Sequence, residues 1–186
     1  MTSSTWVFGY GSLVSPSSMA TTIGRTVDST TDVAVAHLDG YGRRWNYGSL
    51  HKRGDWHDGE VEITGGLVVS LGLEADATES CNGVAVRVTA DELAQLDWRE
   101  RDYERTDVTD QIRLEGPVIS GRIVTYVPRT SAVDRYEQAR DDGRAAIERR
   151  YWDLVHGAFN ELGAGHREHF SKTPDPDIPV VDILIN

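Results

Sequence analysis

The sequence predicts an α+β protein of about six strands in which most helices lie late in the chain. Segments with apolar residues at period two, or in short continuous runs, recur up to residue 127, whereas helical spacing dominates from residue 145. The 186 residues suffice for one well-buried core, and neither an internal repeat nor a linker divides them. We therefore expect a single domain over residues 1–186.

In the first half of the chain, strands alternate with segments that the sequence marks as turns and loops. Pro16 favours a short helix or turn over residues 15–23. Residues 49–64 hold glycines among charged residues and predict a long surface loop, and the small acidic segment 74–79 predicts a turn. The strands expected here are residues 6–8, 33–38, 66–73 and 83–88.

A helix is expected to begin at Thr89, because Glu92 stands three residues later and completes a capping box. Leu93 and Leu96 give this helix an apolar stripe, and it should end near Arg99 or Glu100.

After it, residues 103–112 and 122–127 predict strands. A second helix is expected from Ala145, with apolar residues on one face up to Leu162 and Gly163 in the position of a C-cap. The proline-rich tail ends in residues 180–185, either a final strand or a surface segment.

The charge balance restricts the partners. Acidic residues outnumber basic ones by 30 to 19, a net charge of -11 that repels nucleic-acid backbones and anionic membranes. Cys81 is the single cysteine, so no internal disulfide can form. The N-terminal residues show neither the basic nor the apolar region of a signal peptide, and we find no uninterrupted apolar run long enough to span a bilayer. We expect a cytoplasmic protein that binds neither nucleic acid nor membrane.

Residues 6–14 form the first candidate site. A strand-forming Trp-Val-Phe segment leads into Gly9, Tyr10, Gly11 and Ser12. Glycines on both sides of Tyr10 permit positive φ and a close backbone approach to another group, and consecutive amides in such a turn can hold an anion. An ordinary strand followed by a Gly-Ser loop is the alternative, and the segment is neither a dinucleotide fingerprint nor a P-loop.

Residues 96–108 form the second candidate site. Eight of the thirteen residues are charged with alternating sign, which is typical of a solvated helix end. Trp98 and Tyr103, however, stand on either side of Glu100 in the sequence. Aromatic bulk there would desolvate the Glu100 carboxylate and raise its pKa toward that of a general base.

Together, these segments resemble the gamma-glutamylcyclotransferase-like family. Tyr10-Gly11-Ser12-Leu13 resembles its substrate loop, and Leu96-Asp97-x-x-Glu100 followed by Tyr103-x-Arg105-x-x-Val108 resembles its second motif. Three further motifs resemble its ChaC-type branch: Gly40-Tyr41-x-Arg43-Arg44-Trp45, His51-x-Arg53-Gly54 and Gly83-Val84-Ala85-x-Arg87-Val88. The two-residue spacing between Glu100 and Tyr103, and the long polar segment between Gly54 and Gly65, depart from that branch.

The resemblance implies a small mixed β-barrel or sheet with flanking helices, and a cofactor-free, metal-free enzyme acting on a small γ-glutamyl compound. In such a reaction the α-amine of a γ-glutamyl amide attacks its own γ-carbonyl, giving 5-oxoproline and a free amine. Glu100 would be the general acid and base. Tyr10, Gly11, Ser12 and Leu13 would hold the substrate, with Tyr103 shaping the pocket or donating a hydrogen bond. From the residues alone, Arg43 and Arg44 could either pair with a substrate carboxylate or lie at a solvated strand edge, and Arg44 is taken as the substrate ligand.

Other interpretations remain open at this stage. Ser12 as a nucleophile lacks a Gly-x-Ser-x-Gly elbow and a defined base, and Cys81 suits a buried structural thiol. His51, His57 and Asp58 do not have the spacing of a standard metal site. A sister enzyme acting on γ-glutamylamines, or a binding module without turnover, would share these motifs, and the sequence indicates no oligomeric state.

Overall fold

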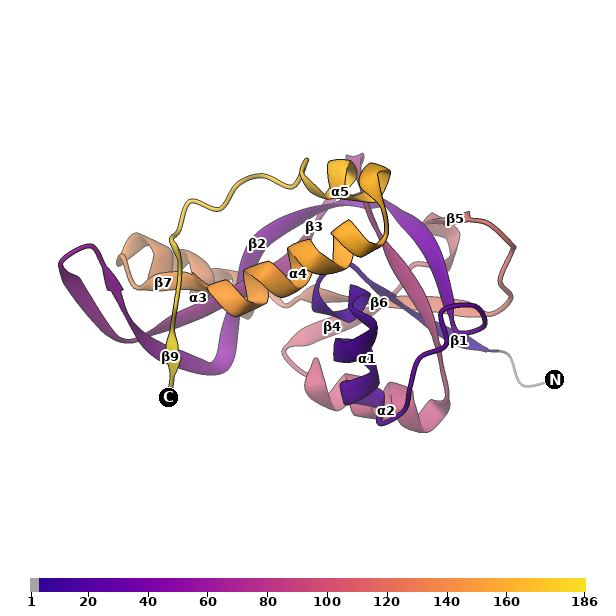
Figure 1. Ribbon diagram of the computed structural model, residues 1–186, viewed down its shortest axis with the longest axis horizontal. Helices are drawn as coiled ribbons and strands as arrows, with labels where there is room; N and C mark the ends of the chain where they lie inside the picture. The colour runs from indigo at the N-terminus through magenta and orange to yellow at the C-terminus, as the bar shows by residue number, and fades with distance from the viewer. Residues whose placement is uncertain (1–3) are drawn as a thin grey trace.

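The computed structural model describes residues 4–186 and consists of one mixed sheet flanked by helices (Figure 1). The strands are β1 (Thr5–Gly9), β2 (Val33–Asp58), β3 (Val61–Val88), β4 (Tyr103–Asp107), β5 (Ile112–Glu115), β6 (Arg122–Pro128), β7 (Ala145–Glu148), β8 (Val180–Val181) and β9 (Leu184–Ile185). The helices are α1 (Pro16–Ile23), α2 (Ala90–Arg99), α3 (Thr130–Asp141), α4 (Arg149–Glu161) and α5 (Ala164–Phe170), with short 3₁₀ turns η1 (Ser12–Val14) and η2 (Thr109–Gln111). The predicted α+β class is confirmed.

The strand order of the sheet is β4-β6-β1-β3-β2-β5. β1 lies centrally, antiparallel to β3 and parallel to β6. β2 and β3 form one long antiparallel hairpin that crosses most of the molecule (Figure 1). β7 adds to β3 in parallel, and the sheet continues through β8 and β9 at the end of the chain. The C-terminal end of β1 is therefore surrounded by chain segments from every part of the sequence.

Two predicted irregular segments belong to this hairpin, so those predictions are wrong. Residues 49–58 continue β2 and residues 61–64 begin β3, with Trp56 opposite Ile63 across the turn. Trp56 is buried, which gives this polar segment an apolar anchor that its glycines and charges conceal. Residues 74–79 also stay extended in β3, where Glu74 pairs with Gly42.

The helices follow their local signals where those signals are strong. Thr89 caps α2, and its capping box with Glu92 is formed on both sides. Ser15 caps α1 just before Pro16. Residues 145–148 form strand β7 instead of the first turn of a helix, because their buried apolar side chains extend along Leu67–Val69 of β3. α4 then begins at Arg149.

α3 was not anticipated. Only Ala132 and Tyr136 are buried in its twelve residues, too few to give a helical stripe in the sequence. The proline-rich tail crosses the surface and contributes two short pairings, β8 with β7 and β9 with β2. Within residues 4–186, no helix has the length and hydropathy needed to cross a membrane.

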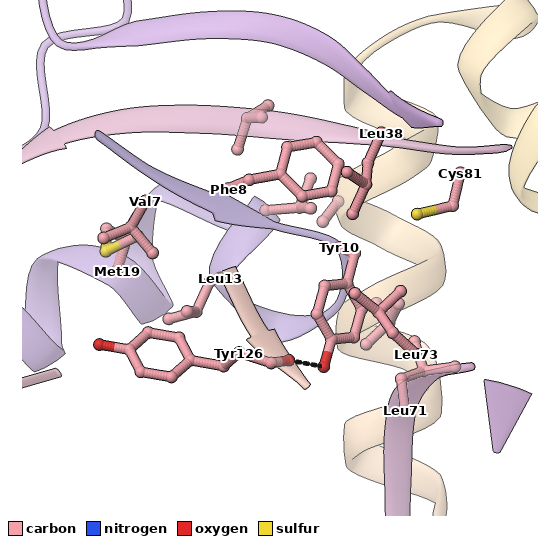
Figure 2. Close-up of a cluster of buried hydrophobic side chains, with 14 of the residues drawn as sticks. Val7, Phe8, Tyr10, Leu13, Met19, Leu38, Leu71, Leu73, Cys81 and Tyr126 are labelled. Atoms are coloured by element: carbon pink, nitrogen blue, oxygen red, sulfur yellow. Dashed lines mark hydrogen bonds between the residues drawn. The ribbon is translucent and has the colours of Figure 1, made fainter. Parts of the chain in front are cut away.

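The core surrounds β1 and the loop that follows it. Val7 and Phe8 are almost fully buried, and Figure 2 shows Tyr10 extending the same cluster toward Leu71 and Leu73. Burying such side chains stabilises the fold by about 1.5–3 kcal/mol each. The candidate loop is therefore fixed by the core itself.

Candidate active site

The loop after β1 is shaped by close packing. A Cβ added to Gly9 would lie 2.8 Å from the Cβ of Leu13, and one added to Gly11 would lie 3.1 Å from the Tyr151 hydroxyl. The expected close approach of the backbone to other groups is therefore confirmed for both glycines. The expected positive φ is not, because neither Gly9 nor Gly11 has one. η1 begins at Ser12, and the first amides of a helical turn have no acceptor within that turn. They are donors that a ligand can use.

Three side-chain hydrogen bonds fix the segment from Phe8 to Tyr10 in place. The Tyr10 hydroxyl donates to the Tyr126 carbonyl at 2.7 Å (Figure 2), and the Thr125 hydroxyl donates to the Phe8 carbonyl at 2.9 Å. Arg43 Nε donates to the Tyr10 carbonyl at 2.8 Å. The backbone of the loop is thus tied to β6 and β2.

Arg43 is a buried cation with an unusual set of partners. It is 3% exposed, and its Nη2 donates to both the backbone carbonyl and the side-chain Oδ1 of Asn82. Its guanidinium lies 4.6 Å from the Phe159 ring centroid and 4.8 Å from that of Phe170. No carboxylate pairs with it among residues 4–186. Burial lowers the pKa of this guanidinium.

Arg44, the arginine named as a substrate ligand from the sequence, lies elsewhere. Its Nη2 is 2.6 Å from Glu79 Oε1 and its Nε is 2.8 Å from Glu74 Oε2. The structure does not bring it to the cavity described below, because successive residues of a strand point to opposite faces. Arg43, one residue earlier, reaches the loop instead.

Glu100 lies at the end of α2 and faces the loop. Its amide donates to the Leu96 carbonyl at 2.8 Å, and its own carbonyl accepts from the Tyr103 amide at 2.8 Å. The side chain is only 14% exposed, and Oε1 lies 3.0 Å from Arg99 Nε. Burial raises the pKa of the Glu100 carboxyl, and the charges of Arg99 and Lys52 oppose this effect without cancelling it.

The apolar surroundings of Glu100 come from tyrosines, and not from Trp98. Trp98 is 73% exposed, so the expectation that it brackets Glu100 is wrong. Residues two apart on a helix do not face each other. The cavity that holds Glu100 is lined instead by Phe8, Gly9, Tyr10, Gly11, Ser12, Leu13, Leu71, Tyr103, Tyr126 and Tyr151.

This cavity brings the predicted loop, Glu100 and Tyr103 together. Tyr103 donates to the Leu71 carbonyl at 3.3 Å, and the Tyr151 hydroxyl accepts from the Leu71 amide at the same distance. Burial raises the pKa of Tyr103 well above its ordinary value and that of Tyr151 to about 12, so both phenols stay protonated at neutral pH. Tyr126 and Tyr151 were missed, since they stand far along the sequence among unremarkable neighbours.

The cavity is narrow. Its volume is about 40 Å³, little more than the roughly 30 Å³ that one water molecule occupies in the liquid. A buried carboxylate with a raised pKa beside free backbone amides can transfer protons and stabilise a developing oxyanion. These groups have the chemistry that acid–base catalysis on a small polar molecule requires.

The structure also shows where the other candidate residues lie. The Ser12 hydroxyl accepts from Arg99 Nη2 at 3.1 Å, and no base contacts it among the described residues. Cys81 is buried outside the cavity, where burial raises the pKa of its thiol to about 11. His57 and Asp58 lie at the exposed tip of the β2–β3 hairpin and form no metal-ligand cluster with His51 in the described chain.

The comparisons with known proteins agree with this fold. The model of the family described as ChaC-like protein matches residues 5–147, which are 143 of the 186 residues. The chain therefore belongs to the ChaC-like family. An Arabidopsis thaliana protein named gamma-glutamylcyclotransferase 2-3 is 29% identical over 130 residues. These cover 66% of this chain and 56% of that protein, so the match spans little more than half of the relative.

Solved structures share the architecture. A gamma-glutamyl cyclotransferase superposes with a TM-score of 0.54 at 14% identity, covering 94% of this chain and 90% of that one. A gamma-glutamyl cyclotransferase specific to glutathione, from yeast, gives a TM-score of 0.52 at 13% identity with the same coverage. At these identities the likeness concerns the fold, and it confirms the expected mixed sheet with flanking helices.

Proposed function

We propose that this chain is a gamma-glutamylcyclotransferase that converts a γ-glutamyl amide to 5-oxoproline and a free amine. The observation that carries the proposal is the position of Glu100, a buried carboxylate of raised pKa beside the Tyr10–Leu13 loop. Membership of the ChaC-like family and the relative named as a gamma-glutamylcyclotransferase support it.

The reaction needs no covalent enzyme intermediate. The α-amine of the substrate attacks its own γ-carbonyl carbon, a new C–N bond closes the five-membered ring, and the original amide C–N bond breaks. Glu100 takes the proton that the amine loses and returns it to the departing nitrogen, so no water is consumed. The enzyme's main task is to hold the folded conformer, because the attack is intramolecular.

The residues of the cavity suit the other tasks. The amides at the start of η1 can donate to the oxyanion that forms on the γ-carbonyl. Tyr103 and Tyr151 fix the wall at Leu71 and exclude water.

A groove connected to the cavity through Arg99, which lines the groove and contacts Glu100 and Ser12, suits the leaving group. It has a volume of about 1180 Å³, and its charged lining residues are Lys52, Arg99 and Arg150, with no carboxylate among the lining. Arg99 is bound to Glu100, whereas Lys52 and Arg150 have no ion-pair partner within residues 4–186. In a chain of net charge -11 this is a local reversal of sign. We therefore favour γ-glutamyl peptides with a free carboxylate, such as glutathione, over γ-glutamylamines.

The direct test is mass-spectrometric detection of 5-oxoproline. Purified protein is incubated with glutathione, with γ-glutamyl amino acids and with γ-glutamylamines, without added metal. Release from at least one is expected. If the compounds bind unchanged, the chain is a binding module on the same fold; if none binds or reacts, the enzyme hypothesis fails.

We also propose that the chain folds as one domain and acts in the cytoplasm. The long hairpin supports the first point, since β1, β5, β7 and β9 all pair with it. The presence of one cysteine, itself buried, supports a reducing compartment. A single cooperative unfolding transition and cell fractionation are the respective tests.

A further inference from the structure

Three residues that play no part in the proposed reaction meet on another face of the sheet. Val35 of β2 pairs with Glu115 of β5, so His37, two residues on, lies diagonally across from Glu115 on the same face. His166 comes from α5, which covers this region, and its carbonyl accepts from Asn82 Nδ2 of β3 at 3.0 Å. The cluster therefore joins three elements that are remote in sequence.

The polar atoms of this cluster point toward one another. One ligand atom from each residue lies within 4.8 Å of the other two. His166 Nε2 is 3.2 Å from Glu115 Oε2, and His37 Nε2 contacts Glu115 Oε1. Both histidine side chains are 15% exposed and Glu115 is 48% exposed. The rings are thus held in place while the carboxylate remains open to solvent.

The surroundings leave these atoms available. Arg113 stands directly opposite His37, but Asp39 satisfies it through two hydrogen bonds of 2.6 and 2.8 Å. His37 Nδ1 is buried without a partner in the described chain, so the polar interactions of this ring pass through Nε2. Within residues 4–186, the carboxylate of Glu115 forms salt-bridge contacts with the two histidines alone.

We propose that His37, Glu115 and His166 bind one divalent transition-metal ion of the zinc type. Two imidazoles and a carboxylate are ligands that Zn²⁺, Co²⁺ and Ni²⁺ accept, whereas Mg²⁺ and Ca²⁺ prefer oxygen alone. Ligand atoms at about 2.0–2.2 Å from one ion are roughly 3.4 Å apart in a tetrahedron. Glu115 already meets this spacing with His166, at 3.2 Å, so only the widest pair of ligand atoms, within 4.8 Å, has to move closer. His169 stands near this set, with its ring centroid 5.2 Å from that of His37, but its Nε2 is hydrogen-bonded to the Ser80 carbonyl at 3.1 Å and it is not one of the ligands.

The ion would fasten α5 to the sheet. That helix carries Phe170, whose ring lies against Arg43. Asn82, which donates to the His166 carbonyl, accepts from Arg43, and Arg43 donates to the Tyr10 carbonyl. A continuous set of contacts therefore leads from the metal cluster to the candidate substrate loop, although none of the three ligands lines the cavity. The proposed ion stabilises the packing of α5 on the sheet and takes no part in proton transfer.

The test uses the full chain without a histidine tag, stripped with a chelator and then dialysed. Calorimetric titration with Zn²⁺ is expected to show one ion per chain, and Co²⁺ to give a visible absorption spectrum. Saturating Zn²⁺ should raise Tm, because an ion that binds only the folded state stabilises it. Glu115→Gln and His166→Ala should each weaken binding at least tenfold to a hundredfold, the loss typical even of outer-shell changes, and remove the gain in Tm.

His57→Ala is the matched control, because His57 is an exposed histidine on the far hairpin. It should leave affinity, stoichiometry and spectrum unchanged. Absence of Zn²⁺ binding to the wild-type chain at millimolar ion would overturn the proposal. So would unchanged affinity in both ligand variants, since the three residues would then be only a hydrogen-bonded cluster.

Discussion

Arg99 Nε lies 3.0 Å from the Glu100 carboxylate, and Nη2 of the same guanidinium lies 3.1 Å from the Ser12 hydroxyl. One arginine thus joins the end of α2 to the loop after β1. This places the carboxylate beside the backbone amides that the proposed reaction requires. In this arrangement the Ser12 hydroxyl is a hydrogen-bond acceptor for Arg99.

Glu100→Gln is expected to lower the rate of the chemical step by about 10²–10⁴-fold, because an amide of the same shape cannot accept the proton. Single-turnover kinetics would measure the loss, with substrate binding largely retained. Glu104→Gln is the control, since Glu104 is a nearby exposed carboxylate. Near-normal turnover in Glu100→Gln, or equal losses in both variants, would mean that Glu100 belongs only to a charged surface.

Asp102 does not serve as a second neutral control. The sequence places it with the exposed charges of this segment, but its side chain is 11% exposed and its Oδ2 accepts from Arg135 at 3.0 and 3.1 Å. Breaking a buried pair leaves a charge without compensation. Asp102→Asn should therefore destabilise the protein, in contrast to Glu104→Gln.

The raised pKa of Glu100 has a consequence for stability. A carboxyl whose folded-state pKa exceeds its unfolded value contributes its full stability below the unfolded pKa of about 4.3, and loses it as pH rises through the folded pKa. At pH 7 the buried charge is therefore destabilising. Glu100→Gln should melt at a higher temperature than the wild type at pH 7, with the difference shrinking toward pH 4. Melting curves across this range measure it; a lower Tm for the variant at pH 7 would show that the Arg99 pair outweighs burial.

The local parts of this fold could be predicted from the sequence, and the long-range parts could not. The capping box of Thr89 and Glu92 is complete within four residues, so α2 was placed correctly. Residues 49–64 are extended only because each half pairs with the other, and residues 145–147 because β3 lies beside them. Neither partner is visible in a short window.

The same distinction applies to the site. The loop and Glu100 form recognisable motifs, whereas Tyr126 enters through its carbonyl, 116 residues along the chain from Tyr10. The sequence alone does not show which of the adjacent residues Arg43 and Arg44 faces the loop, because that depends on which side of the strand each side chain points to. The prediction that Trp98 packs against Glu100 failed because residues two apart in the sequence point in different directions on a helix.

The loop glycines should be more sensitive than the loop serine. A side chain at Gly11 would meet the Tyr151 hydroxyl and Leu71, so Gly11→Val should raise KM strongly or prevent binding. Ser12→Ala removes only an acceptor for Arg99 and should retain most of the activity. Steady-state kinetics on both variants compare the two effects. Complete loss of turnover in Ser12→Ala with intact binding would favour covalent catalysis.

Arg43 and Arg44 form a matched pair for testing which arginine supports the loop. Arg43→Gln would leave the Tyr10 and Asn82 carbonyls without their donor, at a cost of about 1–3 kcal/mol for each buried group. We expect the free energy of unfolding to fall by about 2–4 kcal/mol and KM to rise. Arg44→Gln breaks only partly exposed ion pairs, worth about 0–1 kcal/mol each, and should leave KM unchanged. Urea denaturation and kinetics distinguish them; a raised KM in Arg44→Gln alone would restore that residue as a substrate ligand.

The groove beside the cavity predicts a preference for an anionic leaving group. Lys52 and Arg150 line it without partners of their own in the described chain, and the charge of Lys52 is felt at Glu100. If glutathione is a substrate, wild-type kcat/KM should exceed that for glutathione with its glycine carboxylate amidated by roughly twofold to tenfold, the range expected for solvent-exposed ion pairs. The double variant Lys52→Gln/Arg150→Gln should lose this preference, measured as the ratio of kcat/KM for acid to that for amide, because the loss of Lys52 also acts on Glu100 with either substrate. The preference should also decline with added salt, because exposed charges are screened. Equal rates for acid and amide in the wild type would show that the groove does not select the leaving group, whereas absence of turnover with either would count against glutathione itself.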